Sequence, residues 1–132
     1  MWKVKFAPDA KTDLKKPDKA FAEQVLKGIA KVRKNPLPRP DGYGKPPGNK
    51  QGNNLTGFFK IKYRGIGIRV VYTLVRSEQV MNILVISKRN DEYCYDAAIK
   101  LYQKYGDSIF DDIFKQQNLI IFFRADFTEN VR

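Results

Sequence analysis

The chain has 132 residues, of which 42% are hydrophobic and 13% aromatic, which is enough for one compact core and short for two. Its formal net charge of +11 favours a polyanionic partner, namely nucleic acid, an anionic membrane surface or an acidic protein. The sequence contains no histidine and a single cysteine, Cys94, which excludes an intrachain disulfide, a cysteine metal cluster and histidine-based acid–base chemistry.

The N-terminal part predicts one strand and two helices. Residues 2–6 alternate apolar and basic side chains, as in a short strand. Pro8 and Asp9 open a helix, and Pro17 breaks it before a second helix over residues 18–34. The second helix has an apolar stripe at helical spacing: Phe21, Val25, Leu26, Ile29 and Val32. We expect the two helices to form a hairpin that lies across a sheet.

The middle of the chain predicts a long loop and then three strands. Residues 35–54 are rich in proline, glycine and asparagine, and loops of this length in small domains are often functional. Strands are expected at about 57–64, 67–75 and 80–88. A further helix is marked by Ala97, Ala98, Leu101 and Tyr102.

The stretch FFKIKYRGIGIRVVY, residues 58–72, predicts a β-hairpin with its turn at Gly65 and Ile66. This turn gives the hairpin one apolar face formed by three cross-strand pairs: Phe59 with Tyr72, Ile61 with Val70, and Tyr63 with Ile68. On the other face Lys62 lies opposite Arg69, and Lys60 lies on the same side as both. These cations indicate either a solvated face that protects the sheet edge or an anion-binding surface.

Residues 87–98, SKRNDEYCYDAA, end a strand and begin a helix, a common location for functional residues. Arg89 and Tyr95 are candidates there, although Arg89 is equally interpreted as a surface charge and Tyr95 as a packing residue.

The order of elements, together with NLTGFFKIKYRGIGIRVVY and VISKRNDEYCY, resembles the RelE/ParE toxin superfamily, and within it the RelE branch of ribosome-dependent messenger-RNA endonucleases. The resemblance covers residues 1 to about 104. It implies an α+β fold in which an N-terminal strand and a helical hairpin pack on a small, mainly antiparallel sheet, followed by a C-terminal helix and an extra tail. The RelE branch has two lysines, two arginines and a tyrosine at fixed spacing, and the ParE branch is expected to lack this set. The matching positions are Lys60, Lys62, Arg69, Arg89 and Tyr95.

Cleavage of RNA by the 2′-hydroxyl needs a base, cations for the phosphorane and an acid or cation at the leaving 5′-oxygen. Crowding among cations favours the neutral form of a lysine, and so we expect Lys62, or alternatively Lys60, to be the base. Arg69 suits the phosphorane oxygens, and Arg89 suits the leaving oxygen. Tyr95 is expected to stack on a base or to carry a proton. The result is a metal-independent endoribonuclease without a cofactor.

The resemblance also implies partners. These are messenger RNA held in the ribosomal A site, ribosomal RNA, and a cognate antitoxin that forms a hetero-oligomer with the toxin. We expect a cytoplasmic protein without membrane association, since no signal peptide or membrane-spanning run is visible. A second group of cations fits docking on ribosomal RNA or, equally, a solvated surface: Lys15, Lys16, Lys19, Lys27, Lys31, Arg33, Lys34, Lys45 and Lys50.

Two alternatives use the same scaffold without catalysis: a ParE-like inhibitor of a topoisomerase, and a basic nucleic-acid-binding module. The expected domain covers residues 1–104, and residues 105–132 form an extension of opposite charge, with three basic and five acidic side chains. That extension is expected either to dock on the domain or mediate self-association, or to be irrelevant to activity.

Overall fold

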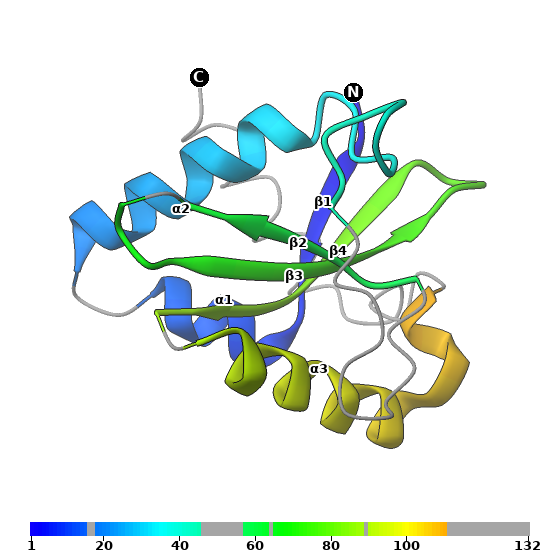
Figure 1. Ribbon diagram of the computed structural model, residues 1–132. Coiled ribbons are helices and arrows are strands. Elements are labelled where there is room, and N and C mark those ends of the chain that lie inside the picture. Colours follow the sequence, from blue (N-terminus) through cyan, green and yellow to red (C-terminus); the bar gives the residue numbers. More distant parts are fainter. Residues whose placement is uncertain (16–17, 46–56, 64, 89, 111–132) are drawn as a thin grey trace.

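The computed structural model describes residues 1–15, 18–45, 57–63, 65–88 and 90–110. The order of elements agrees with the predicted order (Figure 1). The elements are β1 (Lys3–Phe6), α1 (Pro8–Leu14), α2 (Lys19–Val32), β2 (Phe59–Lys62), β3 (Arg69–Val75), β4 (Val80–Ser87), α3 (Asp91–Tyr105) and a 3₁₀ turn, η1 (Gly106–Phe110).

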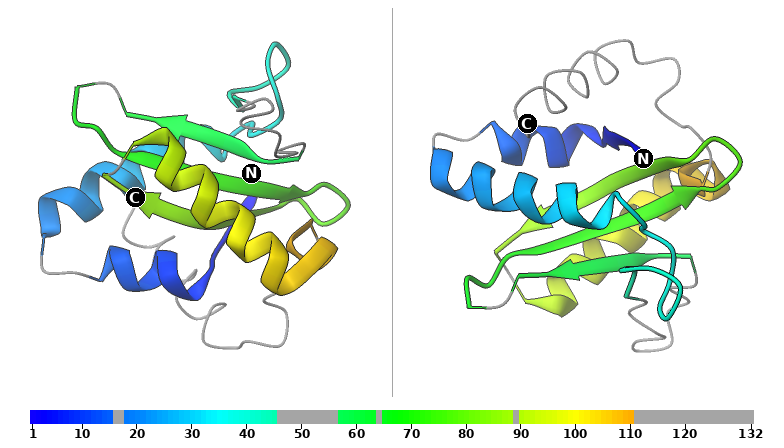
Figure 2. Two further views of the ribbon diagram at one scale, coloured as in Figure 1. Left: turned by 60° about the horizontal axis from the view of Figure 1, so that its bottom comes forward. Right: turned by 90° about the horizontal axis from the view of Figure 1, so that it is seen from above.

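The four strands form one sheet in the order β1-β4-β3-β2. β1 pairs with β4 in parallel, and the other two pairings are antiparallel, so the predicted mainly antiparallel α+β fold is confirmed. The helical pair α1 and α2 covers one face of the sheet, and α3 covers the other (Figure 2). The sheet is therefore the middle of three layers.

Local sequence explains where the helices begin. Pro8 occupies the start of α1, where its missing N–H costs nothing. The side chain of Asp18 caps α2 by accepting a hydrogen bond of 2.9 Å from the Phe21 backbone N–H. Asn90 caps α3 in the same way, with its side chain accepting from the Tyr93 N–H at 2.8 Å. The predicted break at Pro17 lies outside the described residues.

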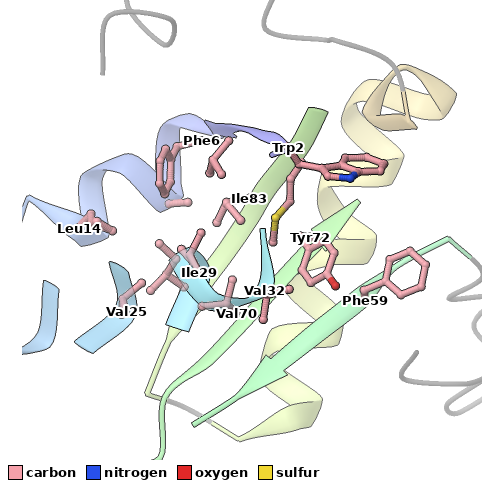
Figure 3. Close-up of a cluster of buried hydrophobic side chains, with 14 of the residues drawn as sticks. Trp2, Phe6, Leu14, Val25, Ile29, Val32, Phe59, Val70, Tyr72 and Ile83 are labelled. Atoms are coloured by element: carbon pink, nitrogen blue, oxygen red, sulfur yellow. The ribbon is translucent and has the colours of Figure 1, made fainter. Parts of the chain in front are cut away.

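Two hydrophobic cores hold the layers together. The larger core lies between the sheet and the α1/α2 pair, where Val25, Ile29 and Val32 of α2 face Val70 and Tyr72 of β3 (Figure 3). The smaller core lies under α3 and contains Val71, Leu84, Val85, Cys94, Tyr95, Ala98 and Ile109. Each face of the sheet thus buries an apolar surface, the main driving force for folding.

The predicted hairpin register is confirmed. Phe59 pairs with Tyr72, Ile61 with Val70 and Lys62 with Arg69. The Tyr63 N–H donates to the Ile68 carbonyl at 3.0 Å beyond the end of β2. Because side chains alternate along a strand, this register places Lys60, Lys62 and Arg69 on one side of the hairpin. That side faces α3, since Asp91 of α3 contacts Lys60 and Arg69.

β4 contains a β-bulge that affects the site. Tyr72 lies opposite Ile83 and Val71 lies opposite Val85, so Leu84 is an extra residue in β4. After the bulge, Val85 and Ser87 share the α3 side with Val71 and Arg69, and Ser87 is the direct partner of Arg69. The bulge therefore orients the last residues of β4 toward the cation-bearing side.

The first part of the long loop folds back on the sheet. The Tyr72 hydroxyl donates to the Pro36 carbonyl at 3.0 Å. The Lys60 backbone N–H donates to the Lys45 carbonyl at 2.9 Å, and an isolated bridge places Lys45 opposite Lys60. One residue of the predicted loop thus covers part of the edge strand β2, while residues 46–54 of that loop lie outside the described residues.

η1 is anchored by its backbone to the centre of the sheet. The Ile109 carbonyl accepts hydrogen bonds from Thr73 Oγ1 at 2.7 Å and from Asn82 Nδ2 at 3.2 Å. All three residues are fully buried. The division of the chain at residues 104 and 105 remains a prediction, and residues 111–132 of the extension lie outside the described residues.

Gly28 in the middle of α2 packs against the Tyr63 ring, and a Cβ built there would lie 2.3 Å from ring atoms. The ring is held because the Tyr63 hydroxyl donates to the Val25 carbonyl at 2.6 Å. Helix propensity alone predicts that Gly28→Ala stabilises by about 1 kcal/mol. We expect the collision to outweigh this gain and to lower the free energy of unfolding by about 1–2 kcal/mol. Urea denaturation tests the sign, and Gln24→Ala, at an exposed position of the same helix, is the control.

Candidate active site

Three of the five predicted site residues come together where β2 ends and β3 begins. Lys60 and Lys62 project from β2, and Arg69 projects from the first position of β3, directly opposite Lys62. Only 15% of the Lys60 side chain and 19% of the Arg69 side chain are exposed, whereas Lys62 is an exposed residue. The sequence suggested an open sheet face, but α3 covers part of it.

Asp91 lies among these cations and was missed by the sequence analysis. Its Oδ1 accepts a hydrogen bond from Arg69 Nε, and its Oδ2 lies 3.9 Å from Lys60 Nζ. Arg69 Nη1 also donates to the Gly67 carbonyl at 3.2 Å. Asp91 is the first residue of α3, directly after the capping Asn90. The available signal was an acidic residue at a helix start beside the cationic strand end, a position that favours a negative charge.

The environment of Asp91 keeps its carboxylate ionised. Burial opposes the charge, but the hydrogen bond from Arg69 and the nearby charges of Lys60, Arg69 and Lys62 outweigh burial and lower the pKa of Asp91 below its usual value of 3.8. Within the described residues the site is therefore a mixed cluster of three cations, Lys60, Lys62 and Arg69, and one anion, Asp91.

Tyr95 lies beneath the cluster on α3, and Lys60 Nζ is 5.8 Å from the centre of its ring. The residue is only 5% exposed, and its hydroxyl has no hydrogen-bond partner among the described residues. The predicted stacking of Tyr95 on a nucleotide base is wrong for this conformation, because the ring is packed in the core under α3. Its proximity to Lys60 leaves the second predicted role, carrying a proton, as a hypothesis.

Cys94 is next to Tyr95 on α3 and is 1% exposed. Burial, with a smaller contribution from Asp91, raises the pKa of the Cys94 thiol, although Arg69 and a hydrogen bond involving Ser87 oppose this shift. A buried thiol that stays protonated is a packing residue rather than a nucleophile. Arg89, the fifth predicted site residue, lies outside the described residues.

The cations predicted either to dock on ribosomal RNA or to form a solvated surface differ in exposure. Lys19 and Lys27 are exposed on α2. The predicted docking role of Arg33 is wrong, because this side chain is 9% exposed and its Nε donates to the Trp2 carbonyl at 3.0 Å. Arg33 instead ties the end of α2 to the N-terminus. Lys45 joins Lys60 through the bridge described above, and Lys16 and Lys50 lie outside the described residues.

A cavity of about 500 Å³ lies among α1, α2, β4 and α3. None of Lys60, Lys62, Arg69 and Asp91 lines it, although Ser87, the cross-strand partner of Arg69, does. Its rim carries Asp9, Asp13 and Asp18, which repel a polyanion. The Asp18 pKa is lowered, first by the hydrogen bond from the Phe21 N–H and also by Lys88, 3.6 Å away. The cation cluster on β2 and β3 is therefore a better candidate than this cavity for binding an anion. In the described part of the chain, no helix is long and apolar enough to cross a membrane.

Three comparisons with known proteins agree with this architecture. The family model for the ParE toxin of type II toxin–antitoxin systems matches residues 4–93. An Escherichia coli protein, provisionally named a RelE-like toxin protein, is 29% identical over 98 residues, which cover 74% of this chain and 93% of that protein.

Solved structures show the same fold. The isolated E. coli RelE toxin matches with a TM-score of 0.53 and 23% identity, covering 76% of this chain and 97% of that chain. The intact E. coli RelBE toxin–antitoxin complex contains a chain that matches with a TM-score of 0.52 and 21% identity, covering 68% of this chain and 99% of that one.

A sheet with a helical pair on one face and a single helix on the other is thus the fold that this chain shares with the isolated E. coli RelE toxin. The chain belongs to the ParE toxin family of type II toxin–antitoxin systems, within the RelE/ParE superfamily.

Proposed function

We propose that this protein is a ribosome-dependent endonuclease that cleaves messenger RNA in the ribosomal A site and thereby inhibits translation. The observation that supports the proposal most strongly is the convergence of Lys60, Lys62 and Arg69 at one end of the β2–β3 hairpin. Three cations held by a paired sheet register can bind a phosphodiester without histidine or metal. Arg89 and Tyr95 belong to the proposal as the remaining members of the set.

The proposed reaction transfers the scissile phosphate within the RNA. The 2′-oxygen forms a bond to phosphorus while the bond from phosphorus to the 5′-oxygen breaks, which gives a 2′,3′-cyclic phosphate and a free 5′-hydroxyl. A lysine, Lys62 or Lys60, takes the proton from the 2′-hydroxyl, and Arg69 binds the phosphorane oxygens. A proton reaches the leaving 5′-oxygen from Arg89 or from water that it polarises.

The ribosome and an antitoxin are the proposed partners. A site with few strong acids and bases gains most from a substrate that is held in a reactive geometry, which the A site can provide. Exposed Lys19 and Lys27 of α2 supply charge for ribosomal RNA. An antitoxin partner is supported by family membership and by the RelBE complex among the structures of the same fold.

A non-catalytic ParE-like toxin is the second candidate. Two observations favour it. The first is that the family model that matches residues 4–93 is that of ParE. The second is that Asp91 places an anion against Lys60 and Arg69, two of the cations that are proposed to bind phosphate. An inhibitor of a topoisomerase would need the fold and the basic surface but no cleavage site.

The test is to incubate the purified protein with programmed ribosomes and, separately, with the same naked messenger, and to map breaks by primer extension. We expect breaks within the A-site codon that require the ribosome and that disappear in Arg69→Ala and Arg89→Ala. If the protein cleaves no messenger but prevents a topoisomerase from supercoiling plasmid DNA, the proposal is contradicted and the ParE-like alternative is favoured.

A further inference from the structure

Asp91 is the one group in the cluster that a phosphate-binding surface does not need, and yet it is held in place. Asn90 fixes the first turn of α3 through its bond to the Tyr93 N–H, and this turn carries Asp91 over the end of β3. Each carboxylate oxygen faces a different cation, Oδ1 toward Arg69 and Oδ2 toward Lys60. The contact therefore links helix α3 to both strands of the hairpin.

We propose that Asp91 is a positioning residue that orients the Arg69 guanidinium and the Lys60 side chain toward the scissile phosphate, an inference that rests on the proposed nuclease function. Arg69 is held at two points, since Nε bonds to Asp91 and Nη1 bonds to the Gly67 carbonyl. Two contacts at different atoms fix the plane of a guanidinium. Lys60 is held between the carboxylate and the Tyr95 ring.

The physical gain is preorganisation. Free arginine and lysine side chains have many rotamers, and this rotamer entropy must be lost when they bind a transition state in one geometry. Because the Asp91 carboxylate already orders the Arg69 and Lys60 side chains in the free protein, this entropy is not lost during the chemical step. The cost is electrostatic, because a fixed anion beside the cluster weakens the attraction of RNA.

These opposing effects give a distinctive signature. Asp91→Ala removes one negative charge, so the protein should bind programmed ribosomes as tightly as wild type or more tightly. It also removes the contact that orders Arg69 and Lys60, so the single-turnover rate at saturation should fall about 10- to 100-fold. Glu92→Ala is the matched control, because it removes the same charge from an exposed residue of the same helical turn and should leave that rate unchanged. Asp91→Glu keeps the carboxylate and should restore part of the lost rate.

A second readout does not depend on cleavage. The ¹⁵N relaxation of the Arg69 Nε–Hε group, assigned by its loss in Arg69→Lys, should report a rigid side chain in wild type and a mobile one in Asp91→Ala. Equal rigidity in both proteins would overturn the proposal, as would an Asp91→Ala rate equal to or above that of wild type. If wild type does not cleave, the proposed function fails, and the relaxation measurement still decides whether Asp91 orders Arg69.

Discussion

A chain that ends at Tyr105 should be severely destabilised relative to one that ends at Phe110. The shorter chain lacks Ile109, whose side chain is fully buried in the core under α3. It also lacks the carbonyl that accepts from Thr73 and Asn82, so two buried polar groups lose a partner. Burial of the Ile109 side chain is worth about 1.5–3 kcal/mol, and each stranded polar group costs about 1–3 kcal/mol. The expected difference of about 3.5–9 kcal/mol is a large fraction of the stability of a small domain.

Urea denaturation of the two truncated chains, followed by circular dichroism, measures this difference directly. Because both chains lack residues 111–132, the comparison isolates the contribution of residues 106–110. Ile109→Ala in the full chain avoids truncation altogether and should cost about 2–5 kcal/mol. If the chain ending at Tyr105 matches the one ending at Phe110 in stability, the anchoring role of η1 is wrong.

Replacement of Arg69 by alanine should lower cleavage on programmed ribosomes about 100- to 1000-fold. This range is what one transition-state hydrogen-bond donor typically contributes when it acts in a preorganised site. Arg69→Lys keeps the charge but cannot grip two phosphorane oxygens in one plane, so it should recover only part of the rate. The fold should survive, because the aliphatic core under α3 does not depend on this side chain.

The measurement is the single-turnover rate at saturating protein, with Arg76→Ala as the matched control. Arg76 directly follows β3 at the end opposite Arg69 and is exposed, so its loss should change the rate little. A drop for Arg76→Ala as large as that for Arg69→Ala would indicate a general effect of charge on ribosome binding instead of chemistry at the cluster.

The order and type of the elements could be predicted because each has a strong local signal. Alternating residues in β1, Pro8 and Asp18 at helix starts, and Gly65 in the hairpin turn together determine most of the architecture. The position of the turn alone predicted the hairpin register. That register in turn predicted that Lys60, Lys62 and Arg69 lie on one side of the hairpin. These features depend on residues that are close together in the chain.

The errors concern contacts between distant residues. Nothing local to Asp91 shows that α3 brings it to Arg69, 22 residues earlier. For Tyr95 the sequence left two interpretations open, a functional residue and a packing residue, and the packing of α3 against the sheet buries it. Arg33 was read as a surface cation because its partner, the Trp2 carbonyl, lies 31 residues away. Which side chains become buried by contacts between distant segments is a tertiary property, and the periodicity of the sequence does not predict it.

The parallel pairing of β1 with β4 has a consequence for synthesis of the chain. Lys3 pairs with Val80, so the first strand made must wait for about 80 further residues before its partner exists. At about 5–20 residues per second, that interval lasts roughly 4–16 s on the translating ribosome. During this time the apolar side of β1 has no sheet to join. The mixed cluster lacks its carboxylate until Asp91 has been made. The surface that carries the proposed site is thus assembled only when most of the chain has been made, and a nascent chain interrupted before Asp91 lacks that arrangement.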